Sequence, residues 1–419
     1  MGVAMHNQFN PAPPTLMHID LNSCFATVEQ QANPLLRGKP VVVAAYTTER
    51  GCILAASVEA KRLGVKTGMR VGDGIQLIPN LVVLPSDPAK YRFVNRKLLA
   101  LLEQYSADVE VKSIDEMVLR VTPVRPPLLK LAQEIKQRIK TEIGEWLTVS
   151  IGIAPNRYLA KLASTIHKPD GLDVIDKENI EKVLAGLRLE DLCGIKQGYG
   201  ARLRRYGITS AITFYHASPK LLTRALASRI GYDWWLRLHG WEASHNWEFG
   251  TKSIGHSYAL YKPYEPTDTR LHQILSQLVE KMGKRLRDGS YQTQGIHVSC
   301  LFTDYTSWNH GEKLTEPLYA SVDLYKKALY LLLQAPVKPV RLLAVTSYFL
   351  TEDLYRQESL LSEEQKKKNL VRALDALDTR WGDFTVFPAR MLDMEHKVQD
   401  RIAFGGVRSL TRSTIYHDG

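Results

Sequence analysis

The spacing of hydrophobic and polar positions predicts short strands alternating with helices over the first 175 residues of the chain. Apolar Leu16, Met17 and Ile19 are typical of a strand, and residues 25–31 continue as an amphipathic helix. Further apolar or β-branched runs predict strands at 41–45, 51–56, 109–111, 117–121 and 148–153, and helices at 58–63, 91–105, 128–143 and 157–165. This alternation predicts an α+β fold.

A different pattern follows residue 176. The apolar spacing is mostly helical to about residue 245. Beyond it we expect a strand from residue 254, a helix at 271–286, strands at 296–302 and 307–314, a helix at 322–333 and a strand at 340–349. Because 419 residues are too many for one ordinary core, two to four domains are expected.

The composition is that of a globular protein with a basic surface. Hydrophobic residues make up 44% of the chain and charged residues 24%. Lys and Arg outnumber Asp and Glu by 55 to 44, a formal net charge of +11. This charge favours a polyanionic partner such as nucleic acid, although a solvated surface of this size explains it almost as well.

Several features bear on the location of the protein. The four cysteines are far apart and form no metal-ligand or CxxC pattern, so we expect reduced thiols, no zinc site and a cytoplasmic protein. No run of 18 apolar residues is present, which excludes a helical membrane span. Residues 1–14 contain three prolines and no signal-peptide core, and we expect them to form a disordered leader.

Two adjacent acids, Asp115 and Glu116, lie where the strands at 109–111 and 117–121 would be joined by a hairpin. Two unit charges about 4 Å apart repel by about 4 kcal/mol at an effective dielectric constant of about 20. A fold tolerates such a pair when the site is wet or when a cation neutralises it. Taken alone, an exposed acidic turn is the more frequent explanation.

A third acid, Asp20, ends the first predicted strand just before the turn and helix cap at Asn22 and Ser23. Mg²⁺ prefers oxygen ligands and takes one or two protein carboxylates together with substrate phosphates. Asp20 with the Asp115 and Glu116 pair would suit two such ions in an in-line phosphoryl transfer.

Four sequence blocks in this order carry a resemblance to a known family. They are HIDLNSCFATVEQ, GCILAASVEAKRLGVKTGM, SIDEM and SIGIAPNRYLAKLASTIHKPDG, all within residues 15–175. In order and spacing they resemble the Y-family, or translesion, DNA polymerases. The similarity continues more weakly to residue 355 and includes KSIGHSYAL at 252–260. Whether the chain is nearer the polymerase IV or the polymerase V branch stays open.

The resemblance implies a multidomain right-hand polymerase. Its expected parts are a palm at 15–24 and 86–175, small fingers at 25–85, a helical thumb with a helix-hairpin-helix at 176–245, a linker at 246–253, a βαββαβ little finger at 254–350, and a C-terminal extension at 351–419. No clear sliding-clamp peptide is recognisable in that extension, so clamp binding stays open.

The resemblance also assigns the chemistry. Asp20, Asp115 and Glu116 are the expected catalytic carboxylates and metal ligands, joined by the carbonyl of Leu21. Two Mg²⁺ ions are the expected cofactors, with Mn²⁺ as a substitute. One would activate the primer 3′-hydroxyl, and the other would bind the triphosphate.

The resemblance places further residues around the incoming nucleotide. Ser23, Cys24, Phe25, Lys61 and Lys168 are the expected nucleotide-binding residues, and Phe25 is the expected steric gate against a ribose 2′-hydroxyl. Gly51 and Cys52 match the small residues that roof the nascent base pair. Val58 departs from the pattern, because many members carry a phosphate-binding tyrosine there.

In the thumb, the expected DNA-phosphate contacts are Gly194, Lys196, Gly198 and Arg202. An ordinary helix turn remains the alternative there, because Lys196 stands where a second hairpin glycine is common.

Template-directed, low-fidelity DNA synthesis past damaged bases is therefore the expected function, with primer-template DNA and deoxynucleoside triphosphates as partners of a monomer. A non-catalytic DNA-binding scaffold is one alternative, and the presence of all three acids argues against it. A metal-dependent phosphodiesterase is another, and it leaves Phe25 and Lys168 unexplained.

Overall fold

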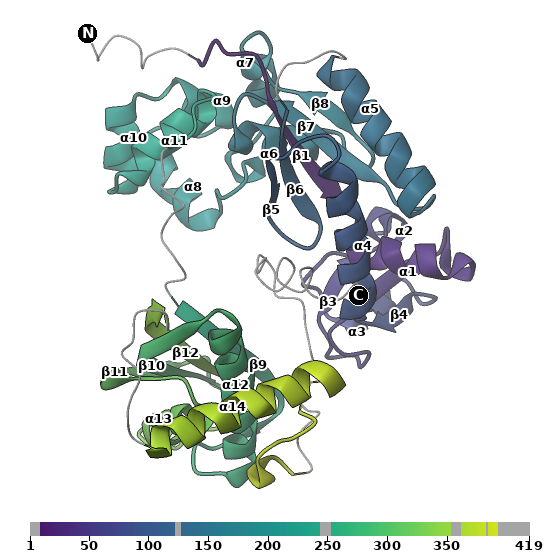
Figure 1. Cartoon of the computed structure of the whole chain (residues 1–419). Coiled ribbons are helices and arrows are strands. Elements are labelled where there is room, and N and C mark those ends of the chain that lie inside the picture. Colours follow the sequence, from purple (N-terminus) through teal and green to yellow (C-terminus); the bar gives the residue numbers. More distant parts are fainter. Residues whose placement is uncertain (1–8, 122–126, 244–252, 353–361, 383, 393–419) are drawn as a thin grey trace. The chain divides into compact units, whose positions relative to one another are not determined.

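The computed structural model describes residues 9–121, 127–243, 253–352, 362–382 and 384–392 of the chain (Figure 1). The described residues divide into two compact units, one within Met1–Ser244 and the other within His245–Asp400. Each unit has its own core, and each is described by itself. None of the helices in these ranges is both long and apolar enough to cross a membrane.

A five-stranded sheet forms the centre of the first unit. Its order is β5-β6-β1-β7-β8, with β1 (Leu16–Leu21) antiparallel to both its neighbours, β6 (Glu116–Arg120) and β7 (Val149–Ala154). The edge strands are β5 (Val109–Val111), antiparallel to β6, and β8 (Leu172–Val174), parallel to β7. Every residue of β1 is buried, including the polar His18 and Asp20.

The alternation along β1 assigns its side chains to two cores. Met17, Ile19 and Leu21 belong to the core formed with α4 (Pro88–Leu102) and α5 (Leu128–Arg138), which continues into a π-helical turn at Ile139–Ile143. Leu16 belongs to the other core, with α6 (Arg157–Ile166). His18 and Asp20 share the face of Leu16 because side chains alternate along a strand.

A small three-stranded sheet follows the first strand and helix. It contains β2 (Val41–Ala44), β3 (Ile53–Ala56) and β4 (Val82–Pro85) in the order β3-β2-β4. The helices of this region are α1 (Cys24–Ala32), the 3₁₀ turn Pro34–Leu36, α2 (Val58–Arg62) and α3 (Val71–Leu77). It has a separate core that includes Val42, Ile53 and Val71.

Helices dominate the end of the first unit. They are α7 (Ile180–Ala185), the 3₁₀ turn Leu189–Asp191, α8 (Gln197–Arg204), α9 (Ala211–His216), α10 (Pro219–Leu226) and α11 (Ile230–Leu238). Their buried residues, such as Phe214 and Trp234, form one core with Leu159 of α6.

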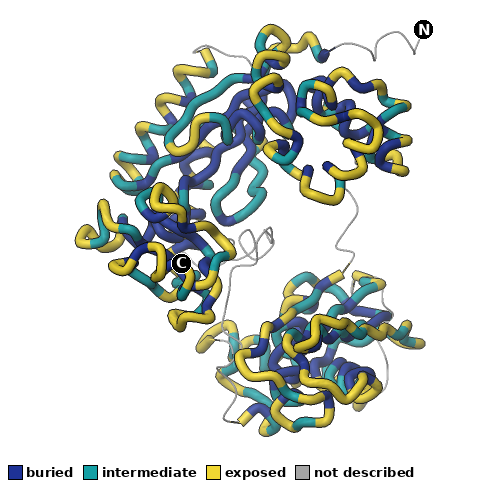
Figure 2. The backbone as a smooth tube through the Cα atoms, turned by 180° about the vertical axis from the view of Figure 1, so that it is seen from behind, coloured by how far each residue is buried: buried dark blue, intermediate teal, exposed yellow. Residues whose placement is uncertain are grey.

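The predicted disordered leader is wrong for residues 9–14. Only 6% of Phe9 is exposed, and it belongs to the core formed with the helices. Figure 2 colours the backbone of each described segment by its burial. The backbone N–H of Asn10 donates to the carbonyl of His239 at 2.8 Å, and its side-chain amide donates to the carbonyl of Gly240 at 2.9 Å. The buried ring and the two hydrogen bonds order this segment. The sequence pattern did not predict the order, because three prolines are more typical of a disordered segment. Residues 1–8 of the predicted leader lie outside the described residues.

The second unit confirms the predicted βαββαβ order. Its elements are β9 (Ser253–Tyr264), α12 (Thr269–Asp288), β10 (Tyr291–Phe302), β11 (Ser307–Leu318), α13 (Ser321–Leu332) and β12 (Val340–Glu352). The sheet order is β11-β10-β12-β9, and all neighbouring strands are antiparallel. Buried residues of both helices form a single core with the sheet.

Part of the expected C-terminal extension belongs to this second unit. Helix α14 (Ser362–Trp381) is tied to α12 by Arg287, whose guanidinium donates to both carboxylate oxygens of Asp375 at 2.6 and 2.7 Å. The short turn Ala389–Met391 buries Met391 completely. Apart from Ser253, which begins β9, the predicted linker at 246–253 lies outside the described residues, as does the tail from residue 393.

Candidate active site

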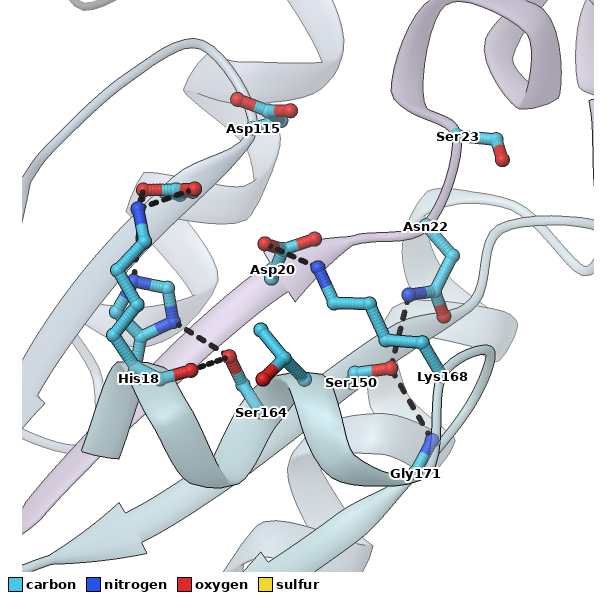
Figure 3. A network of polar contacts seen from close by, with 12 residues as sticks. His18, Asp20, Asn22, Ser23, Asp115, Ser150, Ser164, Lys168 and Gly171 are labelled. Atoms are coloured by element: carbon cyan, nitrogen blue, oxygen red, sulfur yellow. Dashed lines mark hydrogen bonds and ion pairs between the residues drawn. The ribbon is translucent and has the colours of Figure 1, made fainter. Parts of the chain in front are cut away.

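Strand pairing brings the three predicted carboxylates together from two distant segments. Asp20 on β1 pairs directly with Glu116 on β6, and the N–H of Leu21 donates to the carbonyl of Asp115 at 2.9 Å. Asp20 and Asp115 therefore lie at the same end of the sheet (Figure 3). Directly opposed strand residues have Cβ atoms about 5 Å apart, which is within reach of a shared cation.

Repulsion among these acids is visible at Asp115. Burial raises its pKa, and the charges of Asp20 and Glu116 raise it further. The hydroxyl of Ser113 opposes both effects by donating to Asp115 Oδ1 at 2.5 Å. Asp115 thus has a hydroxyl as partner, whereas its two neighbouring acids are paired with cations.

The pKa of Glu116 is lowered, whereas that of Asp115 is raised. Burial favours its neutral form, but His18 and Lys161 outweigh burial and lower the pKa of Glu116 to about 2. Lys161 Nζ lies 2.6 and 2.8 Å from the two carboxylate oxygens, and His18 Nε2 lies 3.6 Å from one of them. The other ring nitrogen of His18 is 3.2 Å from the hydroxyl of Ser164 on α6, so the ring is held from both sides.

Two predicted phosphate-binding lysines lie on the other side of Asp20. Lys168 Nζ is 2.7 Å from Asp20 Oδ2, and Lys61 Nζ donates to Ser23 Oγ at 2.9 Å. Burial and then the charge of Lys168 lower the pKa of Lys61, whereas Asp20 and Asp115 oppose this change. The two ammonium groups therefore repel each other next to the acids, a charge arrangement suited to an anionic ligand.

The loop that carries Lys168 is attached to the end of β1. The side-chain amide of Asn22 donates to Ser150 Oγ at 2.9 Å, and its oxygen accepts from the N–H of Asp170 at 2.8 Å. Ser150 Oγ also accepts from the N–H of Gly171 at 3.3 Å (Figure 3). This network fixes the distance between Lys168 and Asp20.

Ser23 occupies the N-cap position of α1 but makes no capping hydrogen bond, contrary to the predicted cap. Its φ of 53° is left-handed, and its hydroxyl turns to Lys61 instead. Cys24, the next residue, is buried, and burial raises the pKa of its thiol, with further increases from Asp115 and Asp20.

Phe25 is 6% exposed and its ring stacks on Tyr91 of α4, with centroids 4.3 Å apart and planes inclined by 13°. The predicted steric gate is thus an ordered side chain in the first turn of α1. Its contact with Tyr91 crosses 66 positions of sequence, and helical spacing alone gave no sign of it.

The predicted roof residues adjoin β3. A Cβ on Gly51 would lie 1.8 Å from the carbonyl oxygen of Tyr46, so only glycine fits there. Cys52 is exposed and pairs with Arg70 in an isolated β-bridge. Their role over a base pair stays a prediction.

The predicted thumb contacts surround the start of α8. Gly194 has a φ of +89°, Lys196 is the N-cap residue, Gly198 has open space around it, and Arg202 is exposed. A 3₁₀ turn rather than a full helix precedes this hairpin. Contact with DNA phosphates stays a prediction.

Within the described ranges, no three His, Cys, Asp or Glu side chains are gathered as a metal-binding group. Lys168, Ser113 and Lys161 contact the three carboxylates instead. The donor chemistry nevertheless fits a hard divalent cation, since Asp20 and Glu116 are direct partners on neighbouring strands and burial and its acidic neighbours disfavour the charge of Asp115.

The chain is similar to known proteins over most of its length. Residues 19–165 match the impB/mucB/samB family, and residues 251–360 match its C-terminal domain. DNA polymerase IV 1 of Halalkalibacterium halodurans is 31% identical over 92% of this chain and 95% of its own length. DNA polymerase IV 2 of Bacillus subtilis is 31% identical over 92% of this chain and 96% of its own length.

Solved structures are similar as well. A chimeric Y-family DNA polymerase superposes with a TM-score of 0.70 at 26% identity, covering 80% of this chain and 99% of its own. An insertion ternary complex of the Dbh DNA polymerase gives 0.55 at 26% identity with the same coverage.

The chain belongs to the Y-family DNA polymerases, the translesion class of DNA-directed DNA polymerases. Enzymes of this family depend on a divalent metal ion, typically Mg²⁺.

Sequence reasoning missed the residues that support the predicted site. The sequence predicts no role in the site for His18, Ser113 or Lys161, and it predicts Asn22 only as part of a turn and helix cap. All four contact a predicted residue or the loop that carries one. His18 and Asn22 lie two positions before and after Asp20, and this spacing was the available signal.

Proposed function

We propose that this protein adds deoxynucleotides to a primer 3′ end by phosphoryl transfer between Asp20, Asp115 and Glu116, and that it does so opposite damaged template bases. The observation that carries the proposal is the position of these acids at adjoining ends of the paired strands β1 and β6, with Lys168 on Asp20 and Lys61 on Ser23. Primer-template DNA and deoxynucleoside triphosphates are the proposed partners of a monomeric enzyme.

The carboxylates and the carbonyl of Leu21 would hold two Mg²⁺ ions, with Mn²⁺ as a substitute. When bound, such ions lower the pKa of the attacking hydroxyl and neutralise charge on the leaving pyrophosphate. Asp115 gains most from a cation, because burial and two acidic neighbours disfavour its charge. Lys161 keeps Glu116 ionised, and the network of Asn22 keeps the loop of Lys168 in place.

Lys168 and Lys61 would bind the triphosphate. Lys168 contacts Asp20, so a nucleotide that takes Lys168 leaves Asp20 available as a ligand. The ammonium group of lysine is a point charge, whereas the guanidinium group of arginine forms a planar fork. These contacts would therefore attract the triphosphate by charge without fixing its orientation strictly. Lys61 and Lys168 would also have to compensate for Val58, which has no hydroxyl to donate to the triphosphate.

Phe25 would close the space beside the sugar and so exclude ribonucleotides. The small residues Gly51 and Cys52 would leave room above the base pair for damaged bases. In the thumb, Gly194, Lys196, Gly198 and Arg202 would contact a DNA phosphate, and all four residues are exposed.

Primer extension on undamaged and lesion-bearing templates tests the proposal. Asp115→Asn keeps the size and the hydrogen bond from Ser113 but removes the charge. We expect it to lower the extension rate at least about a hundredfold, the scale of one lost electrostatic group. Arg372→Ala, an exposed change on α14, is the matched control.

Unchanged extension by Asp115→Asn would reject these acids as the catalytic group. Absence of any nucleotide-dependent elongation by the unaltered protein, together with DNA cleavage, would favour a phosphodiesterase instead.

A further inference from the structure

The proposed steric gate rests on a second aromatic ring that belongs to another helix. Phe25 is in the first turn of α1, and Tyr91 is in the first turn of α4. The two rings stack nearly parallel, with centroids 4.3 Å apart. Tyr91 is fully buried and its ring lies against one face of the ring of Phe25, so it blocks movement of Phe25 towards that side.

The ring of Tyr91 is itself fixed at its far end. Its hydroxyl donates to Glu29 Oε1 at 3.0 Å and accepts from the N–H of Asp87 at 3.1 Å. Glu29 is one turn after Phe25 on α1, and its other carboxylate oxygen is 2.8 Å from Lys90 Nζ. Burial raises the pKa of Tyr91, which keeps its hydroxyl protonated as a donor. Helix α1 therefore contacts Tyr91 twice, through Phe25 and through Glu29.

A steric gate excludes a 2′-hydroxyl only as far as its ring resists displacement. Turning a side chain by about 30° from its rotamer costs a small strain energy. That energy corresponds to only about a two- to tenfold change in rate. An unsupported phenylalanine would therefore give weak selection, because a bound ribonucleotide could push it aside. A ring that is stacked on a fixed neighbour cannot be pushed towards that neighbour.

We propose that Tyr91 is a positioning residue for sugar selection, which it exerts by holding the ring of Phe25 in place. This inference rests on the proposed function of Phe25 as the steric gate. Tyr91 itself touches neither the nucleotide nor the metal ligands in this account.

The test compares kcat/KM for a deoxynucleotide and the ribonucleotide of the same base in four variants. Tyr91→Leu removes the stacked ring, and we expect it to lower the discrimination ratio about tenfold. Tyr91→Phe keeps the ring and loses the two hydroxyl contacts, and we expect a change of about threefold or less. Phe25→Ala should lower the ratio more than either. Tyr91→Leu added to Phe25→Ala should cause no further change.

The double variant separates positioning from general destabilisation. If Tyr91→Leu merely loosened the fold, it would lower both activities alike and would act equally in either background. Tyr215→Leu is the matched control, because Tyr215 is also buried and stacks on His239 with centroids 4.4 Å apart, within the helical region. It should lower the thermal unfolding midpoint without changing the ratio.

The outcomes are distinct. A normal ratio in Phe25→Ala would reject the gate and the inference together. A lowered ratio in Phe25→Ala with a normal ratio in Tyr91→Leu would overturn the inference alone, as would equal losses in Tyr91→Leu and Tyr91→Phe. If Tyr91→Leu fails to fold, Tyr91→Met, whose flexible side chain adapts better to an irregular space, takes its place under the same criteria.

Discussion

The ionisation of Glu116 depends on two basic side chains that come from β1 and α6. Burial acts to raise the pKa of Glu116, but His18 and Lys161 together lower it to about 2, below its usual value of 4.5. A carboxylate with a lowered pKa in the folded state stabilises the fold above its ordinary pKa, and this stabilisation is lost as the pH falls through the lowered value.

We therefore expect Lys161→Met to lower the free energy of unfolding by about 1 kcal/mol at pH 7, after allowance for the partial exposure of Lys161. The difference from the unaltered protein should persist down to about pH 5 and disappear towards pH 2. Urea unfolding of the metal-free protein at several pH values measures it. Lys338→Met, which breaks a more exposed pair with Asp304, should cost less. A pH-independent loss in Lys161→Met would contradict this account.

The sequence predicted the reacting residues of the site better than their supports. Asp20, Asp115 and Glu116 could be found because acids at the ends of apolar strands are unusual and matched a family pattern. The bond between Asn22 and Ser150 could not, because it joins residues 128 positions apart. Only the pairing of β1 with β7 brings them together, and a single sequence contains no information on that pairing.

The sequence pattern predicted the presence of helices better than their ends and caps. The helix expected at 91–105 begins earlier, at Pro88, because the side chain of Asp87 accepts from the N–H of Lys90 and proline suits the first turn. The region expected as one helix at 128–143 ends in a π-helical turn. Ser23 makes no cap because its backbone is left-handed rather than extended, and its hydroxyl accepts from Lys61.

The ordered N-terminal segment should contribute measurably to stability. Phe9→Ser removes a buried ring from the helical core, and we expect a loss of about 3 kcal/mol in the free energy of unfolding of the first unit. Thermal and urea unfolding would detect it. Ala12→Ser, at an exposed position of the same segment, should be nearly neutral. Equal stabilities would mean that the segment is detached in solution.

An ion pair between Asp375 and Arg287 joins helix α14 to α12. Asp375→Ala leaves Arg287 with its carbonyl and hydroxyl contacts only, so we expect α14 to exchange its backbone amides at least about tenfold faster. Hydrogen–deuterium exchange measures this directly. Arg372→Ala on the same helix lacks such a contact within the described structure and should leave exchange unchanged; faster exchange in that variant would show that helix propensity dominates.

At the scale of the molecule, the two units have separate hydrophobic cores. We expect residues 253–392, expressed alone, to fold cooperatively, because their core contains both helices and all four strands of the second sheet. Circular dichroism with thermal unfolding tests this. Absence of a cooperative transition would show that the second unit needs the rest of the chain.

Removal of metal should separate activity from folding. We expect a chelator to abolish primer extension while shifting the thermal unfolding midpoint by only a few degrees. The reason is that Lys168, Ser113 and Lys161 already contact the three acids without an ion. A collapse of the midpoint on chelation would show that the ions are structural.

The place of β1 in the sheet has a consequence for how the enzyme loses activity. Fraying of a sheet begins at its outer strands, and β1 is the middle strand of five, hydrogen-bonded on both sides. Asp20 consequently stays in register until the sheet as a whole comes apart. After gentle heating, the molecules that remain folded should be fully active. The residual activity should therefore equal the fraction of molecules that remain folded.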